Sequence, residues 1–251
     1  MAGVRLPCHL EDLLTLYYLS GIFCFALFLH LSRHLEGLWH TALITHGKTA
    51  SETERPSIWR IPKSLFSGFY AVGLVTGVAL LRLTALPEVA LLVHLARRYL
   101  ETVSWPYSRQ SKMHLVHALV GLSYYPVLVL SVLSSGDALS MRPWHAMLIA
   151  AASLVQSYCH WQLYRARSEC HHPAKVTYVP MAEHSALFRL LPSPHYLMEI
   201  VIYGVYAAAA GGSPLMLLNW IFVLGNLAIS ARSTTLWHQD RFGEAGGGYR
   251  D

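Results

Sequence analysis

One histidine and one glutamate, four residues apart, are the side chains of this sequence best suited to chemistry. His195 and Glu199 stand at the start of an apolar run that covers residues 200–210. If that run is helical, positions i and i+4 share one face, and the pair lies at the mouth of a single helix. Ionisable groups in a membrane helix are costly, so their presence indicates a functional site. The pair has three interpretations: a cofactor contact, a buried ion pair that fixes the helix, or half of a metal site.

The metal interpretation lacks further ligands. Zinc needs at least a third protein ligand, no HExxH motif is present, and the 15 histidines are scattered. The four cysteines contain no CxxC pair, so neither a zinc site nor a disulfide framework is predicted. We therefore expect no metal. No GxGxxG or GxxxxGK[ST] run is present either, so a nucleotide must be held by helix ends and side chains.

The composition is that of a polytopic membrane protein. Hydrophobic residues make up 54% of the 251 residues and charged residues only 13%, whereas a soluble domain carries about 25% charged residues. Several segments approach the roughly 20 apolar residues that a spanning helix needs. These segments are residues 13–32, 64–86, 87–103, 114–135, 144–162, 196–210 and 214–230. We predict an all-α polytopic membrane protein with about seven transmembrane helices.

The basic residues predict an orientation for these helices. Sixteen of the 19 Lys and Arg residues fall in 33–63, 97–112, 165–189 and the tail after 230. By the positive-inside rule, the C-terminus is then cytosolic and the N-terminus is not. We expect a single membrane domain, in which residues 1–63 form the first transmembrane helix and a cytosolic loop. Residues 64–251 then form the helical bundle with a C-terminal cofactor-binding region.

The predicted cytosolic side gathers polar residues in two places. Gln156 and His160 are again i and i+4, and basic and aromatic residues follow them as far as Glu199. Such a mouth suits a phosphate-bearing ligand, because guanidinium groups bind phosphate bidentately; the alternative is a basic loop with no ligand. In the second place, Glu101 follows Arg97 and Arg98 at helical spacing, which predicts a salt-bridged helix end. Alternatively, Glu101 or His114 faces a membrane cavity and transfers a proton.

Five stretches, in order, resemble the steroid 5-alpha-reductase family. They are Ile61–Phe66 with Phe69–Tyr70, Arg97–Thr102, Ser111–His114, Gly121–Tyr125 and Pro194–Ile200. The last has the PHYxxE form of the polyprenol reductase branch, whereas the steroid branch tends to have Asn at the position of His195. The resemblance covers most of the chain from about Gly47 to Phe242.

This resemblance implies an NADPH-dependent double-bond reductase of the endoplasmic reticulum membrane. The nucleotide would lie in the cytosolic half of the bundle, and a lipid substrate would come from the bilayer. The implied cofactor contacts are Gln156, His160, Arg167, Tyr178, His195, Glu199, Asn226 and His238. Lys112 to His114 falls where the steroid branch has its catalytic tyrosine, so His114 becomes the candidate proton donor, with Glu101 as a second catalytic candidate.

The predicted reaction saturates the α-isoprene double bond of a polyprenyl lipid, for dolichol synthesis and protein N-glycosylation. A polyprenal is a chemically easier substrate than a polyprenol, because negative charge can develop on its carbonyl oxygen. The alternatives are a steroid or enoyl-lipid reductase of the same family, and a degenerate, non-catalytic membrane protein. We expect no nucleic-acid partner and no obligate protein partner.

Two departures from the family pattern and one pair of glycines each have two interpretations. His238 stands where the family usually has a tyrosine, and no YPxxRxxxIP element follows it. The alternatives are weaker NADPH binding and a divergent or shortened copy. Gly73 and Gly77 lie four residues apart in the second apolar segment. That spacing suits either close helix packing or a lateral opening for the lipid.

Overall fold

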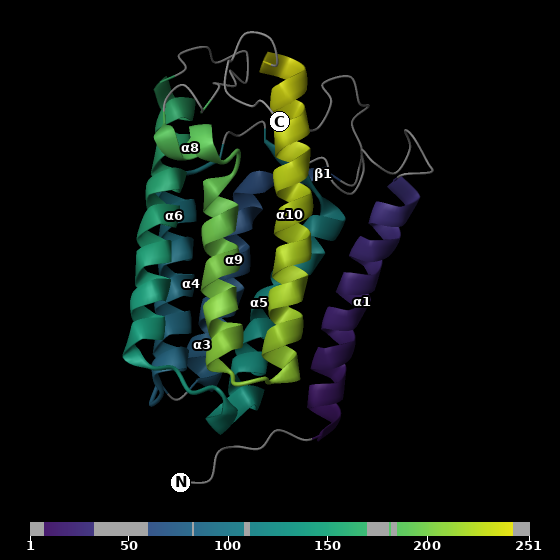
Figure 1. Ribbon diagram of the computed structural model, residues 1–251, viewed down its shortest axis with the longest axis vertical. Helices are drawn as coiled ribbons and strands as arrows, with labels where there is room; N and C mark the ends of the chain where they lie inside the picture. The colour runs from purple at the N-terminus through teal and green to yellow at the C-terminus, as the bar shows by residue number, and fades with distance from the viewer. Residues whose placement is uncertain are drawn as a thin grey trace.

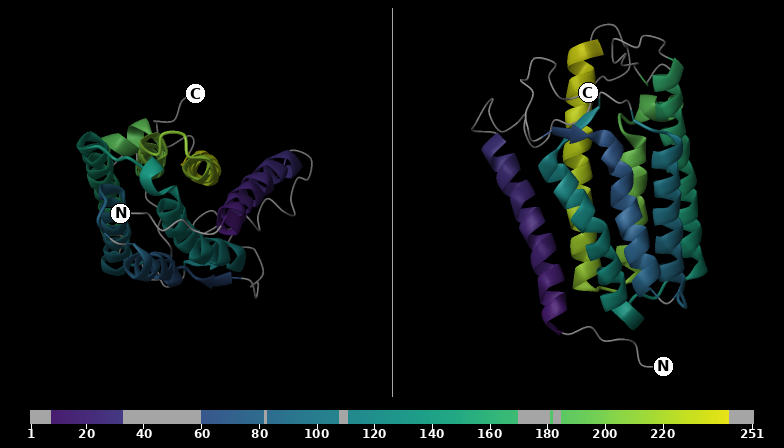
Figure 2. Two further views of the ribbon diagram at one scale, coloured as in Figure 1. Left: turned by 90° about the horizontal axis from the view of Figure 1, so that it is seen from below. Right: turned by 180° about the vertical axis from the view of Figure 1, so that it is seen from behind.

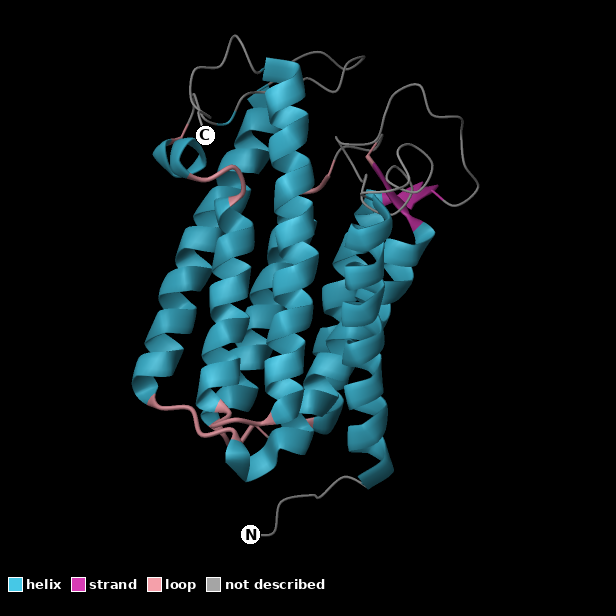
Figure 3. Cartoon of the chain, turned by 45° about the vertical axis from the view of Figure 1, so that its right-hand side comes forward, coloured by secondary structure: helices cyan, strands magenta, loops and turns pink. Residues whose placement is uncertain are grey.

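The structure is a computed structural model that describes residues 8–32, 60–81, 83–107, 111–169, 181 and 185–242. Nearly all of the described chain is helical (Figure 3). The long helices are α1 (Cys8–Ser32), α3 (Phe66–Leu80), α4 (Leu86–Ser104), α5 (Leu115–Ser135), α6 (Pro143–Glu169), α9 (Pro194–Ala209) and α10 (Pro214–Phe242). The short elements are β1 (Arg60–Pro62), η2 (Lys63–Leu65), β2 (Lys112–His114), η3 (Gly136–Ala138) and α8 (Ala186–Leu190). The predicted all-α fold is confirmed.

Four of these helices are long and apolar enough to cross a membrane. Their apolar windows are His9–Leu27, Lys63–Leu80, Leu115–Ser135 and Pro214–Gln239. Of the remaining long helices, α4 and α6 are less apolar because they carry more charged and polar residues, whereas α9 is apolar but has only 16 residues. The protein is therefore a multi-pass membrane protein, and polar side chains of α4, α6 and α9 meet inside its bundle.

The long helices run side by side as one bundle (Figure 1). α3 packs against α4 and α5, α6 packs against α9 and α4, and α10 packs against α9 and α5. α1 stands at the edge of the bundle, where it contacts α10 and α5 (Figure 2). The α4–α6–α9 side thus lies away from α1, with α5 and α10 between them.

One end of the bundle carries a small antiparallel strand pair. β1 pairs with β2 in the register Arg60↔His114, which places the start of α3 beside the start of α5. α8 and the C-terminal part of α10 lie at the same end (Figure 1). We call it the strand end. The predicted domain boundary at residue 63 stays a prediction.

Several predicted helix boundaries shift: α1 begins at Cys8 and not at residue 13, and α6 ends at Glu169 and not at residue 162. The second apolar segment ends as a helix at Leu80, not at residue 86, and the chain turns through Leu83, whose φ is 59°. The last helix continues beyond Ser230 to Phe242. The hydrophobic pattern ends where the chain leaves the membrane, whereas the backbone hydrogen bonds of the helix can continue into the polar sequence that follows.

The glycine pair on α3 supports close packing. A Cβ atom on Gly73 would lie 2.6 Å from Cβ of Tyr125, and one on Gly77 would lie 2.6 Å from a Leu92 methyl carbon. Any side chain at these positions would overlap α5 or α4. Gly73 and Gly77 therefore set the distance between helices, and the described structure gives them no lipid opening to line.

Candidate active site

Glu101 is one of two carboxylates buried among α4, α6 and α9. It forms ion pairs with Arg97 and with Arg98, whose Nη1 lies 2.5 Å away. It also reaches α6, because the Ser157 hydroxyl donates to it at 2.5 Å and His160 Nδ1 lies 2.8 Å from its Oε2. The salt-bridged helix end predicted from spacing is present, and it also joins two helices.

Glu199 is the second carboxylate. The Gln156 side-chain amide donates to it and, at 3.2 Å, to the backbone carbonyl of His195. His94 Nε2 lies 3.5 Å from Glu199 Oε1. Gln156 thus holds the start of α9 against α6, and His94 connects the start of α9 to α4.

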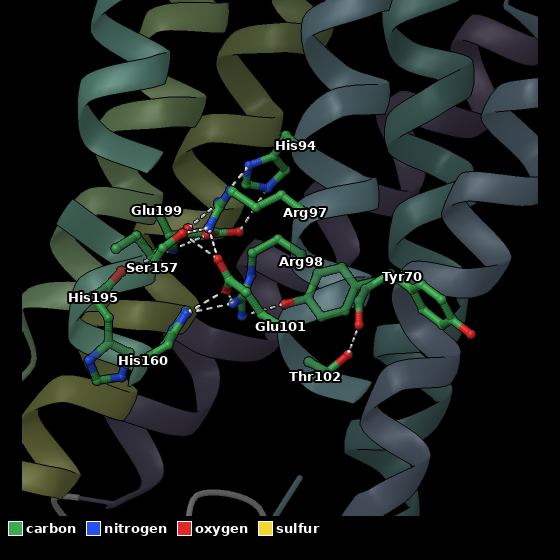
Figure 4. A network of polar contacts seen from close by, with 12 residues as sticks. Tyr70, His94, Arg97, Arg98, Glu101, Thr102, Ser157, His160, His195 and Glu199 are labelled. Carbon is green, nitrogen blue, oxygen red and sulfur yellow. Dashed lines mark hydrogen bonds and ion pairs between the residues drawn. The ribbon is translucent and has the colours of Figure 1, made fainter. Parts of the chain in front are cut away.

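Arg97 joins these two centres into one network, and Arg98 extends the network to Tyr70 of α3 (Figure 4). Arg97 donates to the Gln156 side-chain oxygen at 2.5 Å and to the Ser157 hydroxyl at 2.9 Å. Arg98 donates to the hydroxyl of Tyr70 at 2.9 Å. We call the following set the charged network: Tyr70, His94, Arg97, Arg98, Glu101, Gln156, Ser157, His160 and Glu199.

The charges of this network balance. It contains two arginines and two glutamates, and the side chains of Arg98, Glu101 and Glu199 are nearly buried. An unpaired charge is very costly inside a membrane bundle, so the pairing lets these groups stay ionised there. Breaking one pair would leave its partner charge uncompensated. The arrangement is therefore a fixed set of dipoles and charges from which water is largely excluded.

A basic and aromatic group lies nearer the strand end. Lys63 Nζ lies 4.5 Å from the centre of the Tyr107 ring, and the Arg167 guanidinium lies 5.2 Å from the same centre. Two cations therefore share one aromatic ring through cation–π contacts. The three residues come from η2, the segment after α4, and α6. They form a positive site to which an anionic group can bind.

The structure brings together five of the predicted site residues. Glu101, Gln156, His160 and Glu199 are in the charged network, and the His195 ring lies beside it, 5.3 Å from the His160 ring. Each pair of sequence neighbours at i and i+4 lies on one helix face, as the spacing predicts. The assignment of Gln156, His160, His195 and Glu199 as cofactor contacts, and of Glu101 as a catalytic residue, stays a prediction.

The other predicted residues are distributed differently. His114 is the N-cap of α5, where its Nδ1 accepts a hydrogen bond from Val116 N at 3.3 Å. Asn226 and His238 lie on α10, where His238 is buried with its ring edge-on to Trp237. Arg167 belongs to the basic group around Tyr107. Tyr178 lies outside the described residues.

Sequence reasoning missed three members of the charged network: Tyr70, His94 and Ser157. One signal was available for His94. It precedes Arg98 by four residues and Glu101 by seven, so α4 carries a polar stripe at helical spacing. Tyr70 lies in one of the stretches that resemble the family, but neither it nor Ser157 shows such a spacing, because each is the partner of a residue on another helix.

The fold and the site define a polytopic membrane protein with a charged centre in its helical interior. No family model matches the chain. A polyprenal reductase of Saccharomyces cerevisiae is 30% identical over 202 residues, which are 78% of this chain and 75% of that protein. A polyprenal reductase of Caenorhabditis elegans is 25% identical over 259 residues, covering 80% of this chain and 82% of that protein. The chain belongs to the polyprenal reductase family.

Proposed function

We propose that this chain reduces the α-isoprene double bond of a polyprenal, with NADPH as the source of hydride. The product is the saturated aldehyde, a precursor of dolichol and therefore of the lipid carrier for protein N-glycosylation. The relatives named above are polyprenal reductases, and the charged network is the observation in this chain that carries the proposal. A balanced set of buried charges has little use in a purely structural helix bundle, because apolar packing gives similar stability.

The residues of the site fit a reduced nicotinamide dinucleotide. The carboxylate of Glu199, held by Gln156 and His94, has further lone pairs that can accept from the amide group of a carboxamide. Lys63 and Arg167 offer two cations at the strand end, which suit a phosphate. When bound, the cofactor supplies a hydride. We therefore assign Gln156, Glu199, His195 and His160 to the nicotinamide side, and Arg167 with Lys63 to the phosphate side.

The proton of the reaction needs a donor, and Tyr70 is better placed than His114. Nδ1 of His114 accepts the hydrogen bond that caps α5. Glu101 accepts contacts from two arginines, a histidine and a serine, so its role is to hold Arg98. The Tyr70 hydroxyl accepts from Arg98, and this cation would stabilise the phenolate that remains after proton transfer.

The orientation proposal places the strand end in the cytosol of the endoplasmic reticulum membrane. It rests on the distribution of Lys and Arg, and α10 ends at the strand end, so the C-terminus is cytosolic. A tag after Asp251 should be digested by protease added to intact microsomes. Protection of that tag would overturn the orientation.

The activity is tested by incubating membranes that contain the protein with NADPH and either polyprenal or polyprenol. We expect saturated product from the aldehyde, and faster reaction with NADPH than with NADH. Membranes without the protein are the control. Absence of saturated product from both lipids, with the protein inserted in the membrane, would contradict the proposed function.

A further inference from the structure

A second polar cluster lies deeper in the bundle than the charged network. It consists of Tyr124 on α5, Tyr203 on α9 and Asn219 on α10, and all three side chains are buried. Tyr203 follows Glu199 by four residues, which is about one helical turn away from the strand end. The His94 ring lies 5.8 Å from the Tyr203 ring, edge-on, so this cluster adjoins the charged network. We call it the tyrosine–asparagine cluster.

The hydrogen bonds of this cluster are incomplete. The Tyr124 hydroxyl donates to Asn219 Oδ1 at 2.9 Å. Within the described residues, the Asn219 side-chain nitrogen and the Tyr203 hydroxyl are buried without a hydrogen-bond partner of normal geometry. Each such group loses its hydration without a full hydrogen bond to compensate for the loss. Both of these groups can donate a hydrogen bond, so they call for an acceptor.

The two donors flank the same aromatic ring. Tyr203 lies edge-on to Tyr124, with 6.2 Å between ring centres, and Asn219 is hydrogen-bonded to the Tyr124 hydroxyl. The Phe222 ring stacks on the Tyr124 ring, with 5.5 Å between ring centres and nearly parallel planes. Tyr18 of α1 packs against Phe222. The donors are therefore set in apolar, aromatic surroundings, which suit an isoprenoid chain with one oxygen.

We propose that the Tyr203 hydroxyl and the Asn219 amide bind the aldehyde oxygen of the substrate. This inference rests on the proposed function and names the part of the site that recognises the substrate's head group. A carbonyl oxygen has two lone pairs and can accept both hydrogen bonds. The hydrocarbon tail of the substrate has no hydrogen-bond acceptor for either donor.

The hydrogen bonds from these two donors become stronger during the reaction, as negative charge develops on the oxygen. The β-carbon gains a hydride, the electron pair of the double bond moves toward the carbonyl, and the oxygen becomes an enolate. A proton added to the α-carbon then restores the carbonyl, and NADPH has been oxidised to NADP⁺. Donors fixed in a dry site stabilise the charge on the oxygen more than they stabilise the neutral aldehyde. The cluster should therefore affect the rate more than the affinity.

The test uses three variants of the full-length protein in detergent or membranes. Tyr203→Phe removes one donor, and Asn219→Leu removes the other donor together with the oxygen that accepts from Tyr124; both variants keep most of the side-chain volume. Tyr206→Phe is the matched control, because Tyr206 is a buried tyrosine on the same helix whose hydroxyl donates to the carbonyl of Pro87 at 3.1 Å. Removing that satisfied hydrogen bond should lower the unfolding temperature, whereas Tyr203→Phe should leave it unchanged or raised.

Two measurements are made on each variant. Reduction of citral, a short α,β-unsaturated isoprenoid aldehyde, should fall about 100-fold in kcat for Tyr203→Phe and for Asn219→Leu, with a smaller change in KM. The KM for NADPH should not change. Binding of citronellal, whose α-isoprene unit is already saturated, is measured by its effect on the unfolding temperature beside a hydrocarbon of equal chain length. Wild type and Tyr206→Phe should prefer the aldehyde, and the other two variants should not.

The outcomes separate this proposal from the proposed function. If wild type reduces citral and both variants do so at the wild-type kcat, the oxygen site is overturned while the reductase stands. If wild type reduces no unsaturated aldehyde, the proposed function fails, and the citronellal measurement still decides the oxygen site. Equal stabilisation by aldehyde and hydrocarbon in wild type would mean that water alone satisfies the two donors, which also overturns the proposal.

Discussion

Glu199 of α9 lies within 3.5 Å of His94 of α4, so the motif at the start of α9 is tied to a helix that occurs about a hundred residues earlier in the sequence. Gln156 of α6 holds the same carboxylate from the other side. Three helices therefore fix one charged group, and its position does not depend on a loop. A group held in this way is pre-organised for binding a cofactor at the same place in every molecule.

Replacing Glu199 should weaken NADPH binding. Glu199→Gln removes the charge and keeps the shape, and a lost hydrogen bond to a charged group costs about 1.5–3 kcal/mol. The expected increase in the KM for NADPH is therefore roughly tenfold to 150-fold. The matched control is Glu88→Gln, since Glu88 lies at the opposite end of α4 and accepts from Thr84 N at 3.3 Å. Equal NADPH kinetics in the two variants would contradict the cofactor role of Glu199.

The helical spacing of polar residues predicts much of the candidate site. Glu199, Gln156 and His160 each belong to a pair at i and i+4, and this periodicity is a property of the helix alone. The membrane fold follows equally from the lengths of the apolar segments. What spacing could not predict was which helices face each other. Tyr70 and Ser157 enter the charged network only because α3 and α6 both pack against α4.

The spacing of Gly73 and Gly77 and the position of His114 in the sequence also did not predict which side chains or backbone groups they contact. The spacing of Gly73 and Gly77 suits two structures, and only the positions of Tyr125 and Leu92 decide between them. His114 is the last residue of β2 and directly precedes α5, so its role as an N-cap becomes visible only when the start of α5 is known. Local sequence defines an element well, but the partner of each side chain depends on the whole bundle.

Glu101 should contribute strongly to stability through its two arginines. Glu101→Gln leaves Arg97 and Arg98 without their shared counter-charge, and breaking a buried ion pair costs about 3–5 kcal/mol. We expect a clear fall in the unfolding temperature in detergent. Adding Arg98→Gln to this variant should restore part of the loss, because the uncompensated charge is removed. Strictly additive effects in the double variant would show that Glu101 and Arg98 are not coupled.

Tyr70 should control the rate and not the affinity for NADPH. Tyr70→Phe removes the hydroxyl that accepts from Arg98 and keeps the ring that packs on Phe66 and Tyr125. A lost general acid lowers the rate by about 10²- to 10⁴-fold. The control is Tyr17→Phe, which removes a hydroxyl on α1 that lies 3.0 Å from Ser123 Oγ, outside the charged network. A wild-type kcat in Tyr70→Phe would exclude Tyr70 as the proton donor.

Arg167 should favour NADPH over NADH if the basic group around Tyr107 binds the phosphate that distinguishes them. Arg167→Gln removes one of the two cations that contact the Tyr107 ring and leaves Lys63 in place. We expect the KM for NADPH to rise by about tenfold, from the loss of a charge-assisted hydrogen bond, while the KM for NADH stays the same. Arg165→Gln is the control on the same helix, since Arg165 contacts the Trp161 ring instead. An equal rise for both nucleotides would contradict the assignment.

Gly77 offers a test of how the lipid meets the bundle. A side chain at this position would overlap Leu92, so Gly77→Leu should push α3 away from α4 and disturb Arg98, which bonds both Tyr70 and Glu101. Because the damage is to the helix spacing, we expect equal losses of activity with citral and with a long polyprenal, together with a lower unfolding temperature. Gly68→Leu is the control on the same helix, since a Cβ atom there would meet no other atom within 4 Å. If Gly77→Leu blocked only the long substrate and kept the wild-type unfolding temperature, Gly77 would line the path of the lipid instead of the contact between α3 and α4.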